Sequence, residues 1–411
     1  MFNLVFMERY NIKGLAFFLI GLGVAIEKGV FLAIAALIAL VIAFFDRQGF
    51  SNIHNKYFNK TLILFLIYVG TLALLCLMNW DIHDLKLVLR NFEKIASFLI
   101  VYLLLGKTKN AFLFGSLGFI IGVLMGEASV LQGYFAQTSL LDNRFGGTYG
   151  HPNSLGSVME LTIPFLIYAI YKFRDRLYYA CIGGVTLLSS CACLLISGSR
   201  GAQLAVIGEI CVLLAIYCYR RYKIKSCSKC ILLASFAIAA LILLFIHYSP
   251  RKYDFERVLL WRAAWEMFLD HPVVGVGYDD WNSVYKTAYI SPLAKEPDLP
   301  HCHNFYLHLL STTGIIGTIA YFSFLFGQIK MTIKNSINEY KLFDSNLNIA
   351  DMFGAIICGM LIHNAVDINV IWRYYMLKMF FFWALCCLRF QELEDYDFVT
   401  PEVNLANRRE R

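Results

Sequence analysis

The sequence predicts an all-α polytopic membrane protein with about twelve transmembrane helices, each near the length that spans a bilayer. Of the 411 residues, 59% are apolar and only 16% are charged, whereas soluble domains carry roughly 25% charged residues. Apolar runs recur along the whole chain. Because a backbone inside lipid must satisfy its own hydrogen bonds, these continuous apolar runs indicate helices.

The predicted helices form two groups separated by one long loop. We expect helices over residues 13–28, 30–45, 61–78, 92–105, 111–130, 154–171, 178–197, 202–219, 231–247, 304–328, 349–368 and 373–389. Helices one to nine thus occupy 1–247, the loop 248–303, helices ten to twelve 304–389, and a tail 390–411. The first run lacks a small-x-small cleavage site and counts as a helix. The loop carries tryptophans, an amphipathic run and a G-x-G turn, so we expect it to be ordered and functional.

Basic residues in the short loops predict the orientation of the chain. With the N-terminus inside, one set of loops and the C-terminal tail contain most of the cations: Arg47, Lys56, Lys107, Lys109, Lys172, Arg174, Arg176, Arg220, Arg221, Lys223, Lys225, Lys229, Lys330, Lys334, Lys341, Arg408, Arg409 and Arg411. We therefore expect a bacterial inner-membrane protein with both termini in the cytoplasm and the 248–303 loop in the periplasm. The sequence has no basic stripe with interleaved aromatics, which argues against a nucleic-acid partner.

Most of the twelve cysteines lie within apolar runs, where a thiol behaves as a small hydrophobic group. Cys227 and Cys230 form a single C-x-x-C, which is a weak metal signal without a second pair. Cys302 is the one cysteine expected outside, so no periplasmic disulfide within the chain is expected.

The loop begins with a predicted helix from Asp254 to Leu269, ended by Asp270-His271-Pro272. Arg257, Trp261 and Trp265 recur every four residues and share one face. This pattern suits an amphipathic helix that lies at the membrane surface. The helix is then either a surface anchor or the place where Arg257 holds an anionic headgroup through its planar guanidinium. Trp261 and the neighbouring Arg262 are further candidates for contact with that substrate.

Arg200 lies between two apolar runs, in GSRGAQL, on the predicted outer side. A charge near membrane depth costs several kcal/mol unless it is paired or hydrated. Arg200 is either a functional cation or an arginine that snorkels from a helix end.

A group of polar residues, His301, His303 and Asn304, stands where the long loop meets the tenth helix. A histidine with an ordinary pKa near 6.5 can accept a proton at neutral pH, so His303 is a candidate general base. The alternative is that His303 caps the helix. The alternate spacing of the histidines and the lack of a nearby carboxylate in the sequence argue against a metal site, and we expect neither metal nor cofactor.

Two glycine-rich stretches also lie on the predicted outer side. Arg144, His151 and Asn153 flank Gly146, Gly147 and Gly150, and they either contact a sugar or phosphate or lead into a helix that starts at Pro152. After the loop helix, Gly275 and Gly277 predict a tight turn. Asp279 and Asp280 follow it and suit either a sugar hydroxyl or a helix cap.

Taken in order, these residues resemble the motifs of the O-antigen ligase and polymerase superfamily. The pattern R-x-x-G-T-x3-P-N is matched by Arg144, Gly147, Thr148, Pro152 and Asn153, and the pattern R-x3-L is matched by Arg200 and Leu204. The pattern R-x3-W, with a following P-x-x-G-x-G, is matched by Arg257, Trp261, Pro272, Gly275 and Gly277. The pattern H-[NSQ]-x9-G-x-x-[GTY] is matched by His303, Asn304, Gly314 and Gly317. The resemblance covers residues 140–320; the earlier part is similar only in its helix count.

The resemblance implies a membrane-embedded, metal-independent glycosyl transfer. The donor would be a glycan on undecaprenyl diphosphate, whose diphosphate Arg200 and Arg257 would hold, and His303 would deprotonate or orient the acceptor hydroxyl. In the ligases this hydroxyl belongs to the outer core sugar of lipid A–core, and the product is complete lipopolysaccharide. A single displacement would invert the anomeric centre. Arg144, His151, Asn153, Arg262, His301, Asn304 and Trp261 would contact the substrates.

Other functions also fit the sequence. A polymerase that joins repeat units on the same carrier needs a similar site, although the histidine–glycine pattern and the chain length favour a ligase. A transporter for the same lipid would carry charges at mid-membrane. The acidic residues expected within the membrane, Glu160 and Glu209, are few and have no evident partner in the sequence, which argues against a transporter. A purely structural membrane protein is a third alternative. Homo-oligomerisation stays open.

Overall fold

The computed structural model describes residues 12–45, 55–78, 82–104, 110–137, 144–223, 254–295 and 298–409, without the side chains of Phe45 and 395–409. The predicted ninth helix, 231–247, and the C-x-x-C of Cys227 and Cys230 lie outside these residues. Within them every regular element is a helix, which confirms the all-α class.

The described helices follow one another along the chain. They are α2 (Ile12–Ile26), α3 (Gly29–Phe45), α4 (Lys56–Met78), α5 (Ile82–Leu89), α6 (Asn91–Lys94), α7 (Ala96–Leu103), α8 (Ala111–Phe135), the 3-10 helix η2 (Gly147–Tyr149), α9 (Pro152–Lys172), α10 (Leu177–Ser197), α11 (Arg200–Tyr222), α13 (Asp254–Asp270), α14 (Trp281–Val284), the π-helix η3 (Tyr285–Tyr289), α15 (Phe305–Phe343), α16 (Ile349–His363) and α17 (Arg373–Arg409). Six of them, α4, α8, α9, α10, α11 and α15, are long and apolar enough to cross a membrane, and α2, α3 and α16 are shorter apolar helices. The total of twelve spans stays a prediction.

Several predicted boundaries were wrong, and one of them matters for the site. The segment predicted as one helix over 92–105 contains two short helices, α6 and α7, which follow a third, α5. The helices α15 and α17 continue well beyond their predicted ends. The predicted helix 349–368 ends at His363. Asn364 accounts for this end, because its side-chain Nδ2 donates to the carbonyl of Met360 at 2.8 Å, and asparagine side chains compete with the helical hydrogen-bond pattern. Residues 364–372 therefore form a loop.

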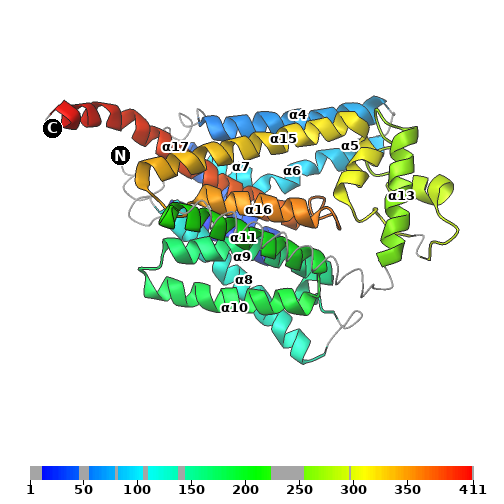
Figure 1. The fold of residues 1–411 in the computed structure, drawn as a ribbon, viewed down its shortest axis with the longest axis horizontal. Coiled ribbons are helices and arrows are strands. Elements are labelled where there is room, and N and C mark those ends of the chain that lie inside the picture. The colour runs from blue at the N-terminus through cyan, green and yellow to red at the C-terminus, as the bar shows by residue number, and fades with distance from the viewer. Residues whose placement is uncertain are drawn as a thin grey trace.

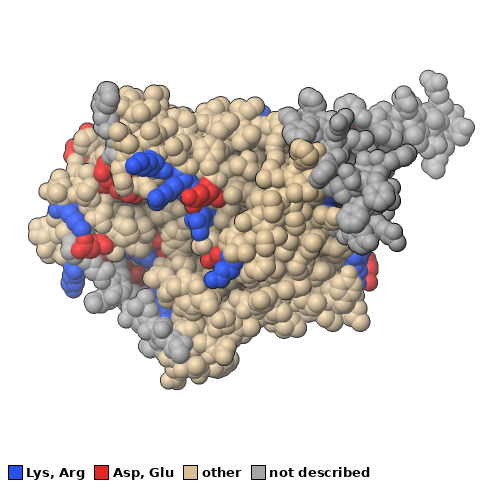
Figure 2. Space-filling model, turned by 180° about the vertical axis from the view of Figure 1, so that it is seen from behind, with Lys and Arg blue, Asp and Glu red and all other residues tan. Residues whose placement is uncertain are grey.

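The long helices lie side by side along the longest axis of the molecule, and α13 crosses one end of them at a steep angle (Figure 1). The start of α15 and the loop between α16 and α17 lie at the same end as α13 (Figure 1). On the face seen in Figure 2, most Lys, Arg, Asp and Glu side chains gather toward this end, and much of the remaining surface is uncharged. The fold thus brings the ends of several helices beneath α13.

The predicted loop helix is present as α13 (Asp254–Asp270). It buries Leu260, Ala264 and Met267 in a small cluster with Trp281 and Cys302. Burying such a face removes apolar surface from water at roughly 25 cal/mol per Å². The cluster ties α13 to the start of α15, so the loop packs as a unit above the membrane helices.

Candidate functional site

A backbone joint connects the turn after α13 to a break in α15. Gly314 interrupts the helix with φ 60°, and the turn hydrogen-bonds across the break: Val276 N donates to Ser311 O at 2.9 Å, Gly277 N to Thr312 O at 3.1 Å and Ile315 N to Pro272 O at 2.9 Å. The two backbones touch, since a Cβ on Gly275 would lie 2.3 Å from the carbonyl carbon of Thr312. Two of the predicted glycine motifs thus form one joint that fixes α13 relative to the start of α15.

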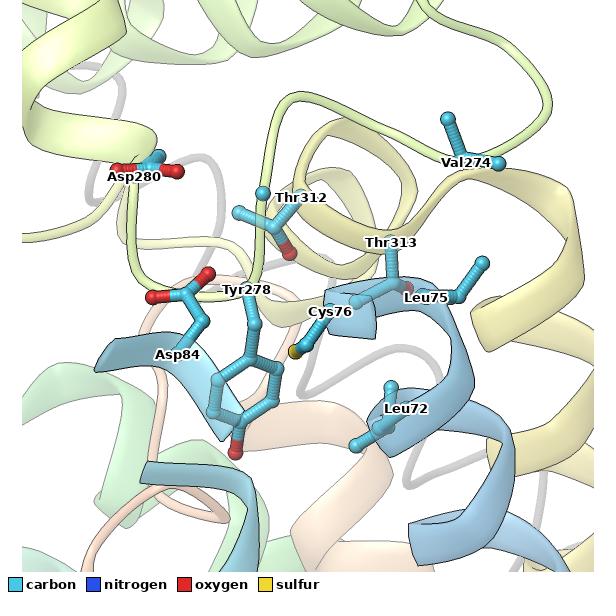
Figure 3. Close-up of a pocket in the computed structure, with 10 residues that line it drawn as sticks. Leu72, Leu75, Cys76, Asp84, Val274, Tyr278, Asp280, Thr312 and Thr313 are labelled. Carbon is cyan, nitrogen blue, oxygen red and sulfur yellow. The ribbon is translucent and has the colours of Figure 1, made fainter. Parts of the chain in front are cut away.

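A small pocket lies beside the joint (Figure 3). Thr312 and Thr313 of α15, Tyr278 and Asp280 of the turn, and Asp84 of α5 line it. Asp84 accepts the backbone N–H of Asp279 at 3.1 Å. Asp280 stands at the N-cap position of α14, but its side chain makes no capping hydrogen bond, so the alternative that Asp280 caps this helix is wrong.

Substituting alanine for Gly275 or Gly314 is expected to loosen this joint. Both glycines have φ in the left-handed region, and the added Cβ of Gly314 would lie 2.3 Å from the carbonyl oxygen of Val273. The strain should cost about 1–3 kcal/mol and lower both thermal stability and activity. Gly184 in α10 is the control, because its Cβ would meet nothing within 4 Å. Equal melting temperatures for all three variants would contradict the joint.

His303 stands immediately before α15 in a strained backbone conformation, with φ 54°. Its ring Nδ1 lies 3.0 Å from Oδ1 of Asp367, and its carbonyl accepts the indole N–H of Trp261 at 3.4 Å. Asn304 caps α15 by accepting the N–H of Leu307 at 3.0 Å, so the alternative that His303 caps the helix is wrong. Strained residues cluster at functional sites.

Asp367 is the residue of the site that sequence reasoning missed. Only 3% of it is exposed, yet Oδ2 accepts from Asn153 Nδ2 at 2.7 Å and Oδ1 accepts from the N–H of Ile368 at 2.9 Å. Burial alone would raise the pKa of Asp367. The hydrogen bond and charge of His303, with the charge of Arg257, outweigh burial and hold that pKa well below its usual range. Asp367 is therefore a buried carboxylate that stays ionised.

The four residues 364–367, here named the 364–367 turn, connect the parts of the site. Asn364 O accepts from Phe305 N at 2.9 Å, Ala365 O from Asn304 Nδ2 at 2.9 Å, Val366 O from Arg257 Nη1 at 2.9 Å, and the Asp367 carboxylate binds His303 and Asn153. A single turn thus fixes α13, the start of α15 and the start of α9.

The predicted group at the start of α9 joins this network. Arg144 donates through Nη2 to Asn153 Oδ1 and through Nε to Ser197 O at 2.9 Å. His151 caps α9 by accepting the N–H of Asn153 at 3.1 Å. Burial, followed by the charge of Arg144, lowers the pKa of His151. Arg144 and Asn153 are therefore linked to His303 through Asp367.

The other predicted cations have different surroundings. Arg257 is partly buried, and no carboxylate among the described residues lies within ion-pair distance of it. Arg200 pairs with Asp254 at 3.3 Å. Arg262 is exposed and pairs with Glu266 at 2.9 Å, so the structure does not bring it to the His303–Asp367 pair. Trp265 is also exposed (45%), whereas Arg257 and Trp261 on the same face of α13 are partly buried.

The ring of His301 packs against the ring of His303, with the two ring centroids 4.5 Å apart. Ligand atoms of His301, His303 and Asp367 lie within 4.8 Å of one another, a group that could hold a metal ion. The sequence argument that no carboxylate is near was therefore wrong, because Asp367 comes from a distant part of the chain. A second such group, His83, Asp84 and Asp279, lies at α5.

The pH dependence of activity should not involve His301. Burial, then the charge of His303, lowers the pKa of His301 to about 4, so His301 is neutral throughout the range from pH 5 to 8. A His301→Gln variant should therefore keep the acid limb of its pH–rate profile at the wild-type position, whatever its rate. A limb displaced by half a pH unit or more would show that His301 titrates in that range.

Comparison with known proteins agrees with the motifs around Arg200, Arg257 and His303. A family model described as O-antigen ligase matches residues 185–322, which include Arg200, Arg257 and His303. No curated protein matches the chain. The matched region carries the joint between α13 and α15 and the strained histidine, and over these residues the chain is similar to the O-antigen ligases.

Proposed function

We propose that the protein is an O-antigen ligase that transfers a glycan from undecaprenyl diphosphate to a hydroxyl of the outer core of lipid A–core. The observation that carries this proposal is Arg257, a partly buried cation without a described carboxylate partner, beside the ionised Asp367 and His303. A partly buried cation is stabilised by an anion, and a diphosphate would supply one through geometry that a guanidinium fits.

The hydrogen bond to Asp367 orients His303 for proton transfer. An ionised carboxylate can only accept hydrogen bonds, so Nδ1 of His303 carries the hydrogen and Nε2 has the free lone pair. Nε2 would take the proton of the acceptor hydroxyl as the hydroxyl oxygen attacks the anomeric carbon. The bond from that carbon to the diphosphate oxygen breaks, and the diphosphate leaves with the electron pair. Because the hydroxyl would attack from the face opposite the diphosphate, the transfer would invert the anomeric centre.

Arginines would neutralise the charge that grows on the leaving diphosphate. Arg257 is held by the backbone of the 364–367 turn. Arg200 is held by Asp254, a contact that a diphosphate could replace with its own charge. Arg144 is linked to the same network through Asn153. The reaction would take place at the periplasmic face of the inner membrane, which the predicted topology favours for this end of the bundle.

A polymerase is the second candidate, because the family covers both reactions. Deleting the gene and running the lipopolysaccharide on a gel, beside an extract of the lipid carrier, separates them. A ligase predicts bare core with long polymer left on the carrier. A polymerase predicts core capped by a single repeat unit. A carrier-linked glycan that stays on the cytoplasmic leaflet would instead indicate a transporter and overturn both.

A further inference from the structure

A second carboxylate–histidine pair lies beneath the candidate site, inside the helix bundle. Glu160 of α9 and His363 of α16 are both buried, and Oε2 of Glu160 contacts Nδ1 of His363. The other carboxylate oxygen, Oε1, accepts the hydroxyl of Tyr375 at 2.9 Å. Glu160 has no evident partner in the sequence, and in the structure it contacts His363 and Tyr375. An ionisable residue at membrane depth is expensive and is usually functional.

This pair supports the 364–367 turn from the membrane side. Asn369 Nδ2 lies 2.7 Å from Nδ1 of His363 and 3.5 Å from Oε2 of Glu160. The backbone N–H of Asn369 donates to Oδ1 of Asn364 at 2.9 Å, which closes the loop around Asp367. Ser157, one turn before Glu160, donates to Oδ1 of Asn369 at 2.9 Å. A continuous polar network therefore runs from Glu160 to the residue that begins the turn.

The neighbouring helix packs directly against this network. A Cβ on Gly201, the residue after Arg200, would lie 2.6 Å from Cδ2 of His363 and 2.9 Å from Cγ2 of Val366. The start of α11 thus touches both the buried histidine and the turn. Any shift of His363 would displace the turn, whose carbonyls and carboxylate fix Arg257 and His303.

We propose that Glu160 is a positioning residue for the transfer reaction. Through His363 and Asn369 it fixes the 364–367 turn, and through the turn it sets the geometry of His303, Asp367 and Arg257. This inference rests on the proposed function of the same site. It assigns a role to a residue that lies outside every motif of the sequence and does not touch the substrates.

Glu127 of α8 provides a matched control. It is also a fully buried carboxylate of a membrane helix, and it accepts hydrogen bonds from the hydroxyls of Ser189 and Ser190 on α10. None of its described contacts reaches the turn. Glu127→Gln and Glu160→Gln therefore make the same chemical change in similar surroundings, and only the second removes a group that supports the site.

The experiment measures transfer by purified full-length protein in liposomes, from a carrier-linked glycan to lipid A–core, with melting temperatures taken in parallel. Glu160→Ala should lower kcat about 100-fold, the usual effect of a misplacement near 1 Å. Glu160→Gln keeps one acceptor oxygen and should recover part of that loss. Glu127→Gln should stay within about threefold of the wild type, since it changes no contact of the turn.

A double-mutant cycle separates positioning from general stability. If Glu160 acts through the turn, Glu160→Gln should cause no further loss in an Asp367→Asn background, because coupled residues are not additive. If the loss in kcat of the double variant equals the product of the two single losses, the two residues act independently and the proposal is overturned. A wild-type kcat in Glu160→Gln would also overturn it. If Glu160→Ala does not fold, Glu160→Gln and Tyr375→Phe test the same network.

The two proposals fail in different ways. Wild-type protein without transfer activity from the carrier-linked glycan would contradict the ligase function itself. Active wild type, inactive His303→Ala and unimpaired Glu160→Gln would contradict only the positioning role. Equal losses in Glu127→Gln and Glu160→Gln would also overturn it, because buried carboxylates would then matter through stability alone.

Discussion

Asp367→Asn is expected to lower the rate of transfer by roughly 100- to 10,000-fold, the range over which a positioned proton acceptor contributes to catalysis. The protein should still insert and fold, because the substitution changes no volume. The reason is the hydrogen-bond pattern around the carboxylate. Oδ1 accepts from Ile368 N and faces His303, and Oδ2 accepts from Asn153. An asparagine has only one oxygen to offer these donors.

Either orientation of the new amide leaves donors facing donors. If its oxygen stays toward His303, its NH2 meets the NH2 of Asn153. Asn153 cannot turn to accept it without losing the hydrogen bond that its own oxygen receives from Arg144. If the amide oxygen turns toward Asn153, its NH2 meets Nδ1–H of His303 and favours the wrong tautomer, with the hydrogen on Nε2.

A charge-swap variant separates geometry from charge. In Asn153→Asp with Asp367→Asn, one carboxylate and one amide remain side by side, but the charge moves away from His303. We expect a melting temperature close to that of the wild type and no recovery of kcat. Activity within about threefold of the wild type in Asp367→Asn alone, far below the loss expected of a general-base partner, would remove Asp367 and His303 from the proton-transfer step.

The sequence predicted those parts of the site that can be recognised from neighbouring residues in the chain. Helix periodicity placed Arg257 and Trp261 on adjacent turns, and α13 forms over almost the predicted residues. The all-helical class followed from composition, because apolar runs of that length allow no other backbone in lipid. His303 was recognisable as a polar residue just before the start of a membrane helix, and its carbonyl contacts Trp261 of α13.

Asp367 could not be found in this way, because its importance depends on contacts between distant segments. It lies 64 residues after His303 and 214 after Asn153, inside an apolar pattern that favoured continuing the helix. Its one signal was a lone carboxylate near the end of a membrane helix. Arg262 shows the opposite failure: it is adjacent to Trp261 in sequence but points away, because consecutive residues lie about 100° apart on a helix.

Arg257→Ala is expected to lower kcat by about 100- to 1,000-fold, the usual loss when one preorganised group that stabilises developing charge is removed. Arg257→Lys should recover little of this. A lysine keeps the charge but cannot donate to the carbonyl of Val366 and to a phosphate with the planar geometry of a guanidinium. Arg257 already donates Nη1 to Val366 at 2.9 Å, and this bond fixes the plane of the group before substrate binds.

Arg262→Ala is the matched control, since it removes the same side chain five residues further along α13. Arg262 is exposed and paired with Glu266, and a surface pair of this kind contributes about 0–1 kcal/mol. We expect its loss to leave kcat nearly unchanged. The transfer assay should also respond to salt differently in the two cases, because a partly buried arginine is screened less than an exposed one. Similar losses in Arg257→Ala and Arg262→Ala would mean that α13 attracts its substrate by overall charge. The guanidinium of Arg257 would then have no special part in neutralising the leaving group.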